Sequence, residues 1–281
     1  MGTILRLLAV VVFAAVIMVA LLLAGIALFM GQMERSAAES SESLYLYELG
    51  LSTTGPIENA VLLIPVPVWY NPDSGNNETI LDMSRAHLRN FGNVSASIED
   101  VGGIPMLNIS ADRIEPLYTN RIEPIPIRPG QNESELPQPT HVYATRSSEA
   151  TPVLVGMEVH MQVTDAGHAI DTRMPVGSEP LFAPYRIVES FDGSRRLIEE
   201  EDYSVSPGSS GYIVEVPLIL SYDAADDNVL TVSSELQGVN QWWVLGWRSN
   251  SYHERLRHAF SGACNDTYPV KAVLVTGEGV Y

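Results

Sequence analysis

Residues 7–30 read LLAVVVFAAVIMVALLLAGIALFM, and this unbroken apolar run determines how the rest of the chain is organised. As a helix, its 24 residues at about 1.5 Å each extend roughly 36 Å, which exceeds the roughly 30 Å of a bilayer's hydrocarbon core. Fifteen of them are Leu, Ile, Val or Phe, which favours insertion by roughly 5–9 kcal/mol. The run is therefore predicted to be a transmembrane anchor, with the lipid bilayer as the partner of residues 7–30.

The charges around this run predict its orientation. Arg6 and the α-amino group precede it, whereas Glu34 and Arg35 cancel just after it. Because positively charged flanks stay in the cytoplasm, we expect residues 1–6 to be a cytoplasmic stub and the rest to be extracellular, in a single-pass protein of the cell membrane. The alternative is a signal peptide cleaved near Ser36-Ala37-Ala38. The apolar region of a signal peptide is usually about 7–15 residues, so this longer run favours an uncleaved anchor.

The predicted outer part is strongly acidic and has a single cysteine. Residues 32–281 hold all 34 acidic residues and 15 of the 16 basic ones, a net charge of −19. Nucleic acid and anionic lipid surfaces both require a basic footprint, so no nucleic-acid partner is expected. Cys264 cannot form an intramolecular disulfide, so the fold must depend on its core, and we interpret Cys264 as a small buried hydrophobe.

Several N-x-S/T sequons lie on the predicted outer side. There are five of them, against roughly two expected by chance from this composition. Their use would make the chain a glycoprotein with sugars on exposed segments. The acceptor residues are Asn77, Asn93, Asn108, Asn132 and Asn265.

Alternating apolar residues predict that the outer part is mainly β. The clearest example is 153–163, where Val and Met alternate with other residues at period 2. Pro65 and Pro67 cannot donate ladder hydrogen bonds, so the second half of 57–70 should lie at a sheet edge or leave the sheet. The other predicted strands are 44–51, 211–222, 229–236 and 270–276, and short helices are expected at 80–90 and 252–260.

Regular strand spacing with Pro and Gly turns predicts a β-sandwich-like extracellular domain over residues 44–281. The preceding segment 32–43, QMERSAAESSES, is small and polar and is predicted to be a flexible stalk. The polar segment 128–150 is interpreted as a loop inside the domain. The alternative is that this segment divides the domain into two β subdomains.

The stretch 240–260 is the richest candidate for a binding surface, because it holds three of the four tryptophans. An exposed Trp can stack on the apolar face of a sugar ring while neighbouring polar groups bind the hydroxyls. The alternative is that the aromatic residues are core and the polar ones form a solvated loop. The candidate contact residues are Trp242, Trp243, Trp247, Arg248, Asn250 and Tyr252.

No motif in the sequence predicts catalysis, a metal or a cofactor. GxSxG, HExxH and glycine-rich phosphate loops are absent. His160, Asp165, His168 and Asp171 lack the tight spacing of a metal site, so no metal is expected. The carboxylate run 199–202 points in different directions, whereas glycoside hydrolysis needs an opposed pair across a cleft.

Three parts of the chain together resemble a loose group of uncharacterised archaeal envelope proteins with a single N-terminal membrane anchor and a β-rich extracellular domain. The parts are GPIEN (55–59) with IPVP (64–67), DTRMPVG (171–177) with EP (179–180), and the segment WW to GWRSNSY (242–252) with VTGEGVY (275–281). The resemblance implies an archaeal, surface-facing setting and carries no assigned chemistry.

The tether, the acidic outer part and the lack of a catalytic motif favour a non-enzymatic envelope protein that binds a partner protein or a glycan. One alternative is an envelope hydrolase acting on surface polysaccharide or protein, with His160, Glu158 and the run 199–202 as its candidate residues. Another is an accessory subunit of a membrane complex, since Gly25 flanked by Ala24 and Ala27 would allow close helix packing.

Overall fold

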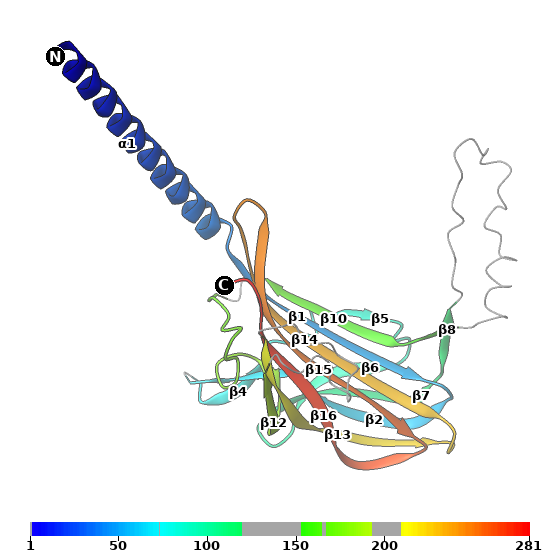
Figure 1. The fold of residues 1–281 in the computed structure, drawn as a ribbon. Coiled ribbons are helices and arrows are strands. Elements are labelled where there is room, and N and C mark those ends of the chain that lie inside the picture. Colours follow the sequence, from blue (N-terminus) through cyan, green and yellow to red (C-terminus); the bar gives the residue numbers. More distant parts are fainter. Residues whose placement is uncertain (1, 73, 120–152, 165–166, 193–208) are drawn as a thin grey trace, which may run out of the picture.

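The computed structural model describes residues 2–72, 74–119, 153–164, 167–192 and 209–281, and Figure 1 shows one long helix followed by a domain of strands. The predicted loop 128–150, the sequon Asn132, Asp165 and the run 199–202 lie outside these residues. The helix is α1 (Gly2–Glu39). The strands are β1 (Glu42–Thr53), β2 (Ile57–Pro65), β3 (Pro67–Asn71), β4 (Asn76–Thr79), β5 (His87–Arg89), β6 (Ser95–Asp100), β7 (Pro105–Ile114), β8 (Leu117–Thr119), β9 (Val153–Val155), β10 (Met157–Thr164), β11 (Leu181–Phe182), β12 (Arg186–Asp192), β13 (Ser210–Ala224), β14 (Val229–Trp243), β15 (Trp247–Ser261) and β16 (Cys264–Gly279).

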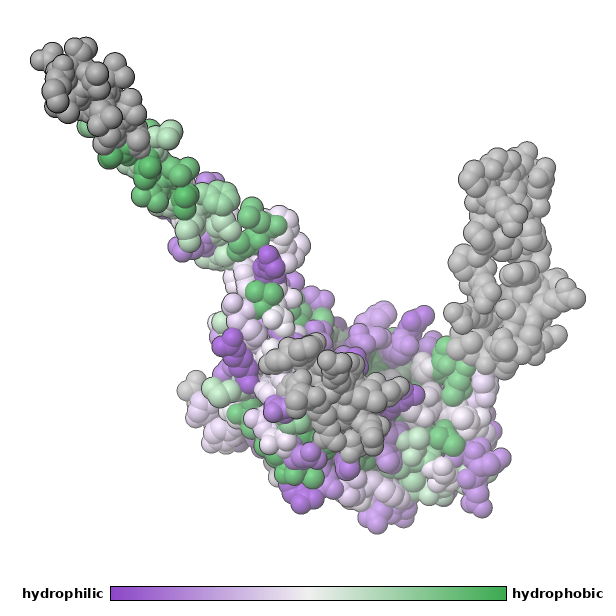
Figure 2. Space-filling model, in the orientation of Figure 1, coloured by the Kyte–Doolittle hydropathy of each residue, from purple (hydrophilic) through white to green (hydrophobic). Residues whose placement is uncertain are grey.

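Helix α1 confirms the predicted apolar helix at the N-terminus. Its segment Val16–Glu39 is long and apolar enough to cross a membrane, and none of its most apolar stretch is buried against the domain. Figure 2 shows this apolar surface extending away from the domain, whose own surface mixes polar and apolar residues. The length and composition of the helix fit a membrane anchor or a secretion signal.

The segment 32–43 is not the flexible stalk predicted from its composition. Helix α1 continues to Glu39, and β1 already begins at Glu42. Gln, Met, Glu, Arg and Ala, which make up most of 32–39, are strong helix formers, so the local propensity extends the helix. The Ser40 hydroxyl donates to the Ser36 carbonyl oxygen at 2.6 Å, where the helix ends. The helix therefore leads almost directly into the sheet.

The outer domain is mainly β, as predicted, but its main sheet is a curled half-barrel and not clearly a sandwich (Figure 1). Eleven strands form this sheet, in the order β5-β10-β1-β14-β15-β16-β13-β2-β7-β6, with β12 also paired to β13. Strands β13 to β16 are 15 or 16 residues long, and each pairs along most of its length. Because every strand twists in the same sense, such a long continuous sheet curls instead of separating into two layers.

One hydrophobic core lies inside the curl. Tyr47 and Leu49 of β1, Ile64 of β2 and Leu218 of β13 belong to a single cluster of buried side chains. Phe182 of β11 closes this core and meets the Tyr47 ring edge-on, with 6.3 Å between ring centroids. Cys264 is buried in the same cluster, as predicted.

The prolines of 57–70 end one strand and move the chain to another sheet. Strand β2 stops at Pro65, and β3, which begins at Pro67, lies in a separate three-stranded sheet of order β11-β3-β4. This result confirms the prediction that the second half of 57–70 leaves the sheet. The chain can cross here because a proline has no N–H to offer to the ladder.

The two predicted short helices are wrong. Segment 80–90 holds turns and the short strand β5, and 252–260 lies within β15. In β15 the buried residues Tyr252, Glu254 and Leu256 alternate with partly exposed ones, which is strand periodicity. The pattern was hidden because a carboxylic acid, Glu254, occupies a core position.

Candidate functional site

The exposed members of the tryptophan-rich stretch lie on the hairpin between β14 and β15. Trp243 and Trp247 face each other across the hairpin, and their rings meet edge-on with centroids 5.7 Å apart and an interplanar angle of 80°. Trp242 is half-buried, and Arg248 is exposed. The two exposed rings pack against each other at the tip and do not form a flat platform for a sugar ring.

The other two candidate contact residues are part of the folded core. Tyr252 is fully buried, and its hydroxyl donates to the Pro180 carbonyl oxygen at 2.8 Å. Asn250 is 8% exposed and accepts a hydrogen bond from the Thr172 hydroxyl at 3.0 Å. The structure therefore does not bring the six predicted contact residues together on one surface.

A different group of polar side chains does converge, on the face of the main sheet opposite the core. Register places His160 of β10 beside Glu48 of β1, Glu48 beside Glu235 of β14, and Glu235 beside Arg255 of β15. Glu158, two residues from His160, lies on the same face because side chains alternate along a strand. These five residues, the outer-face cluster, line a hollow of about 370 Å³.

Contacts within the outer-face cluster hold its charges in two groups. The two ring nitrogens of His160 lie 3.4 Å from Glu48 Oε1 and 3.2 Å from Glu158 Oε2. Across the hollow, Arg255 Nη2 donates to Glu235 Oε1 at 2.9 Å. All five side chains are between one-third and two-thirds exposed, so they can still be reached from solvent.

The electrostatics of Glu235 differ from those of Glu48, which lies directly opposite on β1. His253, whose Nδ1 lies 3.7 Å from Glu235 Oε1, and then Arg255 lower the pKa of the Glu235 carboxyl despite partial burial. Within the described part of the chain, Glu48 pairs with His160, and its side chain is 62% exposed. Two like charges on neighbouring strands repel each other, so the hollow favours a ligand that supplies positive charge beside Glu48.

The arrangement of the outer-face cluster lacks an activated nucleophile. Ser233 lines the hollow, but its hydroxyl donates to the Gly50 carbonyl oxygen at 3.3 Å. A serine nucleophile instead needs a base within hydrogen-bond reach of its hydroxyl. Among the residues whose placement is described, no group of three or more His, Cys, Asp or Glu side chains is arranged to hold a metal ion.

His168 lies apart from His160, and its half-exposed side chain meets a buried carboxylate on the core side of the sheet. Its Nε2 is 3.2 Å from Glu179 Oε2, which also accepts a 2.5 Å hydrogen bond from the buried Tyr45 hydroxyl. The Asp171 backbone N–H donates to Glu179 Oε1 at 2.8 Å. Burial and the bond to Glu179 raise the pKa of Tyr45. This network fixes the loop 167–180 to the sheet and is structural.

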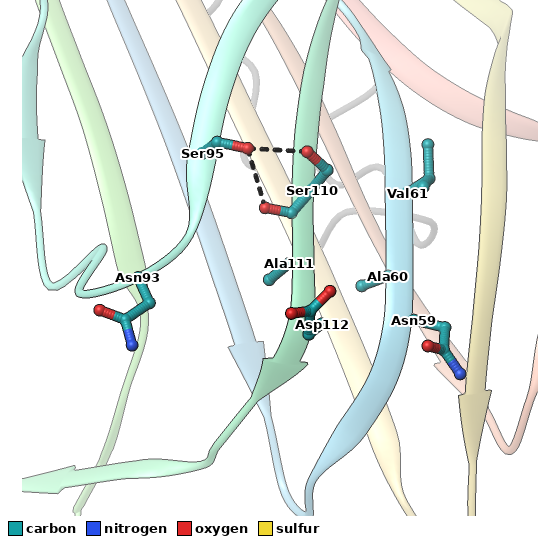
Figure 3. Close-up of a pocket in the computed structure, with 8 residues that line it drawn as sticks. All are labelled: Asn59, Ala60, Val61, Asn93, Ser95, Ser110, Ala111 and Asp112. Carbon is teal, nitrogen blue, oxygen red and sulfur yellow. Dashed lines mark hydrogen bonds between the residues drawn. The ribbon is translucent and has the colours of Figure 1, made fainter.

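A second hollow, of about 460 Å³, lies across β2, β7 and β6 (Figure 3). Figure 3 shows it lined mostly by short side chains, with Ser95 bonded to the Ser110 hydroxyl at 2.7 Å. Asp112 is the one acidic residue among those that line it, and no basic residue does. Because few charged or aromatic groups converge there, this hollow is a weaker candidate than the outer-face cluster.

The sequon asparagines that the structure describes differ in accessibility. Asn77, Asn93 and Asn265 are exposed. Asn108 is half-buried in β7, and its amide donates to Glu99 Oε1 at 2.6 Å. The first three are therefore accessible to a glycosylating enzyme, and of these the Asn77 amide donates to the Gly103 carbonyl oxygen at 2.9 Å.

Sequence reasoning missed Glu48, Glu235 and Arg255. Each stands between two buried residues of its strand, so alternation placed it on the outer face without revealing its neighbours. Of the hydrolase candidates, the structure brings His160 and Glu158 together. Comparisons with models of protein families, with curated proteins and with solved structures find no match to this chain.

Proposed function

We propose that the protein is a membrane-anchored, non-enzymatic interaction protein of the cell envelope. In this proposal α1 crosses the membrane with residues 1–6 in the cytoplasm, and the β domain is outside and binds a partner through the outer-face cluster. The observation that supports it best is the solvent-accessible hollow in which residues from four strands converge. The bare apolar surface of α1 supports the anchor.

The chemistry of the hollow favours a protein partner over a glycan. None of the described residues that line it is Phe, Tyr or Trp, so these residues offer a sugar ring no surface on which to stack. Carboxylates of Glu48 and Glu158 stand beside the basic residues Arg255 and Arg257, a pattern that complements the mixed charges of a protein surface. A partner lysine or arginine next to Glu48 would relieve its repulsion with Glu235.

A photo-crosslinking residue in place of Arg257, at the rim of the hollow, tests this proposal in native membranes. We expect one or a few dominant protein adducts, which mass spectrometry would identify. The same crosslinker in place of exposed Glu99 on β6 is the matched control and should give none of these adducts. Equal adducts from both positions, or none from Arg257, would argue against an interaction through this face.

Charge removal then tests whether the cluster itself binds. The double variant Glu48→Gln, Glu158→Gln should reduce the Arg257 adduct several-fold, because it removes the carboxylates that attract the partner. Glu215→Gln is the control, since Glu215 pairs with Arg186 outside the hollow. An unchanged adduct in the double variant would show that these carboxylates do not bind the partner.

Topology can be tested separately on intact cells. Asp227 lies in the exposed turn before β14, so Asp227→Cys should react with a membrane-impermeant maleimide if the domain is outside. The native Cys264 is buried and serves as the unreactive background. Labelling that requires lysis of the cells would place the domain in the cytoplasm.

An envelope hydrolase is the second candidate, because His160 lies within 3.4 Å of two carboxylates, as a general base would. The double variant His160→Asn, Glu158→Gln should then abolish hydrolysis of an envelope polysaccharide or protein. Absence of any hydrolysis by the wild-type protein would leave binding as the role of this cluster.

A further inference from the structure

The hairpin between β14 and β15 extends beyond the rest of the sheet, beside the end of α1 (Figure 1). The Trp243 backbone N–H donates to the Ser40 hydroxyl at 2.8 Å, which joins the hairpin to the residue that follows the helix. Strand β14 runs antiparallel to β1 and thus back towards the helix. The tip therefore continues along α1 towards its apolar part.

Apolar side chains are exposed at this tip. Trp243 is 44% exposed, Leu245 73% and Trp247 64%. The tip segment 242–247 reads WWVLGW and carries no charge, although the chain as a whole has a net charge of −18. Large exposed apolar groups in such an acidic domain indicate a surface that contacts a membrane or another protein.

The neighbouring chain end adds to the same surface. Val280 donates its backbone N–H to the Ser249 carbonyl oxygen at 2.9 Å, so the C-terminus lies along the base of the hairpin. Val280 and Tyr281 are about half exposed, and the Arg173 guanidinium lies 3.8 Å from the Tyr281 ring centroid. Tyrosine, tryptophan and arginine together are typical of the layer between lipid tails and water.

The depth of the tip fits that layer. Leu245 lies in the turn two residues beyond the end of β14 at Trp243, so it advances at most about 7 Å, which is the rise of four to five helical residues and reaches at most the level of Arg35 or Ser36. The predicted apolar run ends at Met30, about another 8 Å along the helix. The headgroup layer outside the hydrocarbon core is roughly 5–8 Å thick on each side, and helix tilt shortens the remaining gap.

We propose that the hairpin tip 242–247 inserts into the headgroup layer of the same bilayer that α1 crosses, and so fixes the orientation of the β domain on the membrane. This inference rests on the proposed membrane anchor. The insertion depends on aromatic and apolar contacts and not on charge, so it occurs on zwitterionic lipid. The outer-face cluster is then held at a fixed angle to the membrane.

The test uses the full chain in phosphatidylcholine vesicles, with Leu245→Cys carrying an environment-sensitive nitrobenzoxadiazole probe. Asp227→Cys, in the turn at the opposite end of β14, carries the same probe as the matched control, and labelled wild-type protein reports any reaction at buried Cys264. We expect shallow spin-labelled lipid to quench the probe at 245 at least about threefold more than the probe at 227, because the tip lies at headgroup depth. Aqueous iodide should show the reverse order.

Alkaline carbonate extraction separates failure of this inference from failure of the anchor. Protein that stays in the membrane while both probes respond alike would overturn the hairpin insertion alone. If carbonate releases the protein and iodide quenches both probes, the hairpin insertion and the proposed membrane anchor are both wrong. A triple variant, Trp243→Ser, Leu245→Ser and Trp247→Ser, probed at Val244→Cys, should lose lipid quenching yet remain anchored.

Discussion

At the scale of single residues, Glu254 gives the β domain a distinctive dependence on pH. Its side chain is fully buried in β15, and among the described residues the Phe182 backbone N–H, at 2.7 Å, is the one donor to its carboxyl group. Burial raises the pKa of Glu254 from 4.5 to about 8, although the bond from Phe182 opposes the shift. The folded chain therefore holds this proton across a pH range in which the unfolded chain has lost it.

The free energy of unfolding should consequently fall as pH rises from about 4.5 through about 8, by up to about 1.4 kcal/mol per pH unit from this one group. Glu254→Gln is neutral at every pH and should remove that slope, so the variant becomes more stable than wild type above pH 8. Urea unfolding at pH 5, 7 and 9 measures the difference. Exposed Asp227→Asn serves as the control and should follow the wild-type slope; identical slopes in wild type and Glu254→Gln would contradict the prediction.

The contact between Tyr45 and Glu179 makes a second residue-scale prediction. Tyr45→Phe removes a 2.5 Å hydrogen bond to a carboxylate that is 3% exposed. Loss of a partner from a buried charged group should lower the free energy of unfolding by about 1–3 kcal/mol. Tyr70→Phe, which removes a hydroxyl from a 63% exposed ring, should change it little. Equal effects of the two substitutions in denaturant unfolding would show that this buried bond contributes nothing.

At the scale of elements, the pairing of β14 with β15 depends on a glycine. Gly238 lies opposite Tyr252, whose fully buried ring covers it. A Cβ at Gly238 would lie 2.2 Å from Tyr252 Cε1, and the ring cannot move away because its hydroxyl bonds to Pro180. Gly238→Ala should destabilise the domain by about 1–3 kcal/mol through overpacking.

Thermal unfolding in detergent measures this effect, and Gly31→Ala is the matched control. Gly31 lies in α1, and a Cβ there would meet nothing within 4 Å. The unfolding midpoint of the control should match that of wild type. If Gly238→Ala were equally harmless, the Tyr252 ring would have to move freely in the core.

The elements show which structural features the sequence could predict. The predicted strand 153–163, recognised by period-2 alternation, corresponds to β9 and β10, and the other predicted strands correspond to β1, β13, β14 and β16. The prolines at 65 and 67 predicted where the chain leaves the main sheet. Local composition gave two wrong predictions. Segment 32–39 was predicted to be a flexible stalk, but its helix-forming residues extend α1. Segment 252–260 was predicted to be a helix, because the buried Glu254 interrupts the apolar alternation of β15.

The outer-face cluster could not be predicted because strand register is non-local. Glu48 meets His160 on one side and Glu235 on the other, and these partners come from segments more than 100 residues away in the chain. Alternation assigns each residue to a face but does not say which strand lies beside it. The tryptophans were recognised as unusual, but their position beside α1 depends on the same long-range pairing of β14 with β1.

At the scale of the whole molecule, the net charge should lower the free energy of unfolding. The chain carries 34 acidic and 16 basic residues, and a net charge of −18 opposes the compact state through self-repulsion. Salt screens this repulsion, which stabilises the folded chain, but it also weakens attractive pairs such as Arg89 with Glu158, which destabilises it. Exposed pairs contribute little, however, so repulsion among the unmatched carboxylates should dominate.

Raising the salt concentration from about 0.05 M to about 1 M, where the Debye length falls to roughly 3 Å, should therefore raise the unfolding midpoint of the detergent-solubilised full chain by several degrees. Sodium chloride and tetramethylammonium chloride should act alike if screening is the cause, whereas specific cation binding would favour sodium.

A variant with Asp100, Asp226, Asp227 and Asp266 replaced by Asn removes four charges from exposed positions. Its midpoint should be higher at low salt and gain less from added salt. A midpoint that falls with salt in both proteins would mean that attractive pairs outweigh the net repulsion.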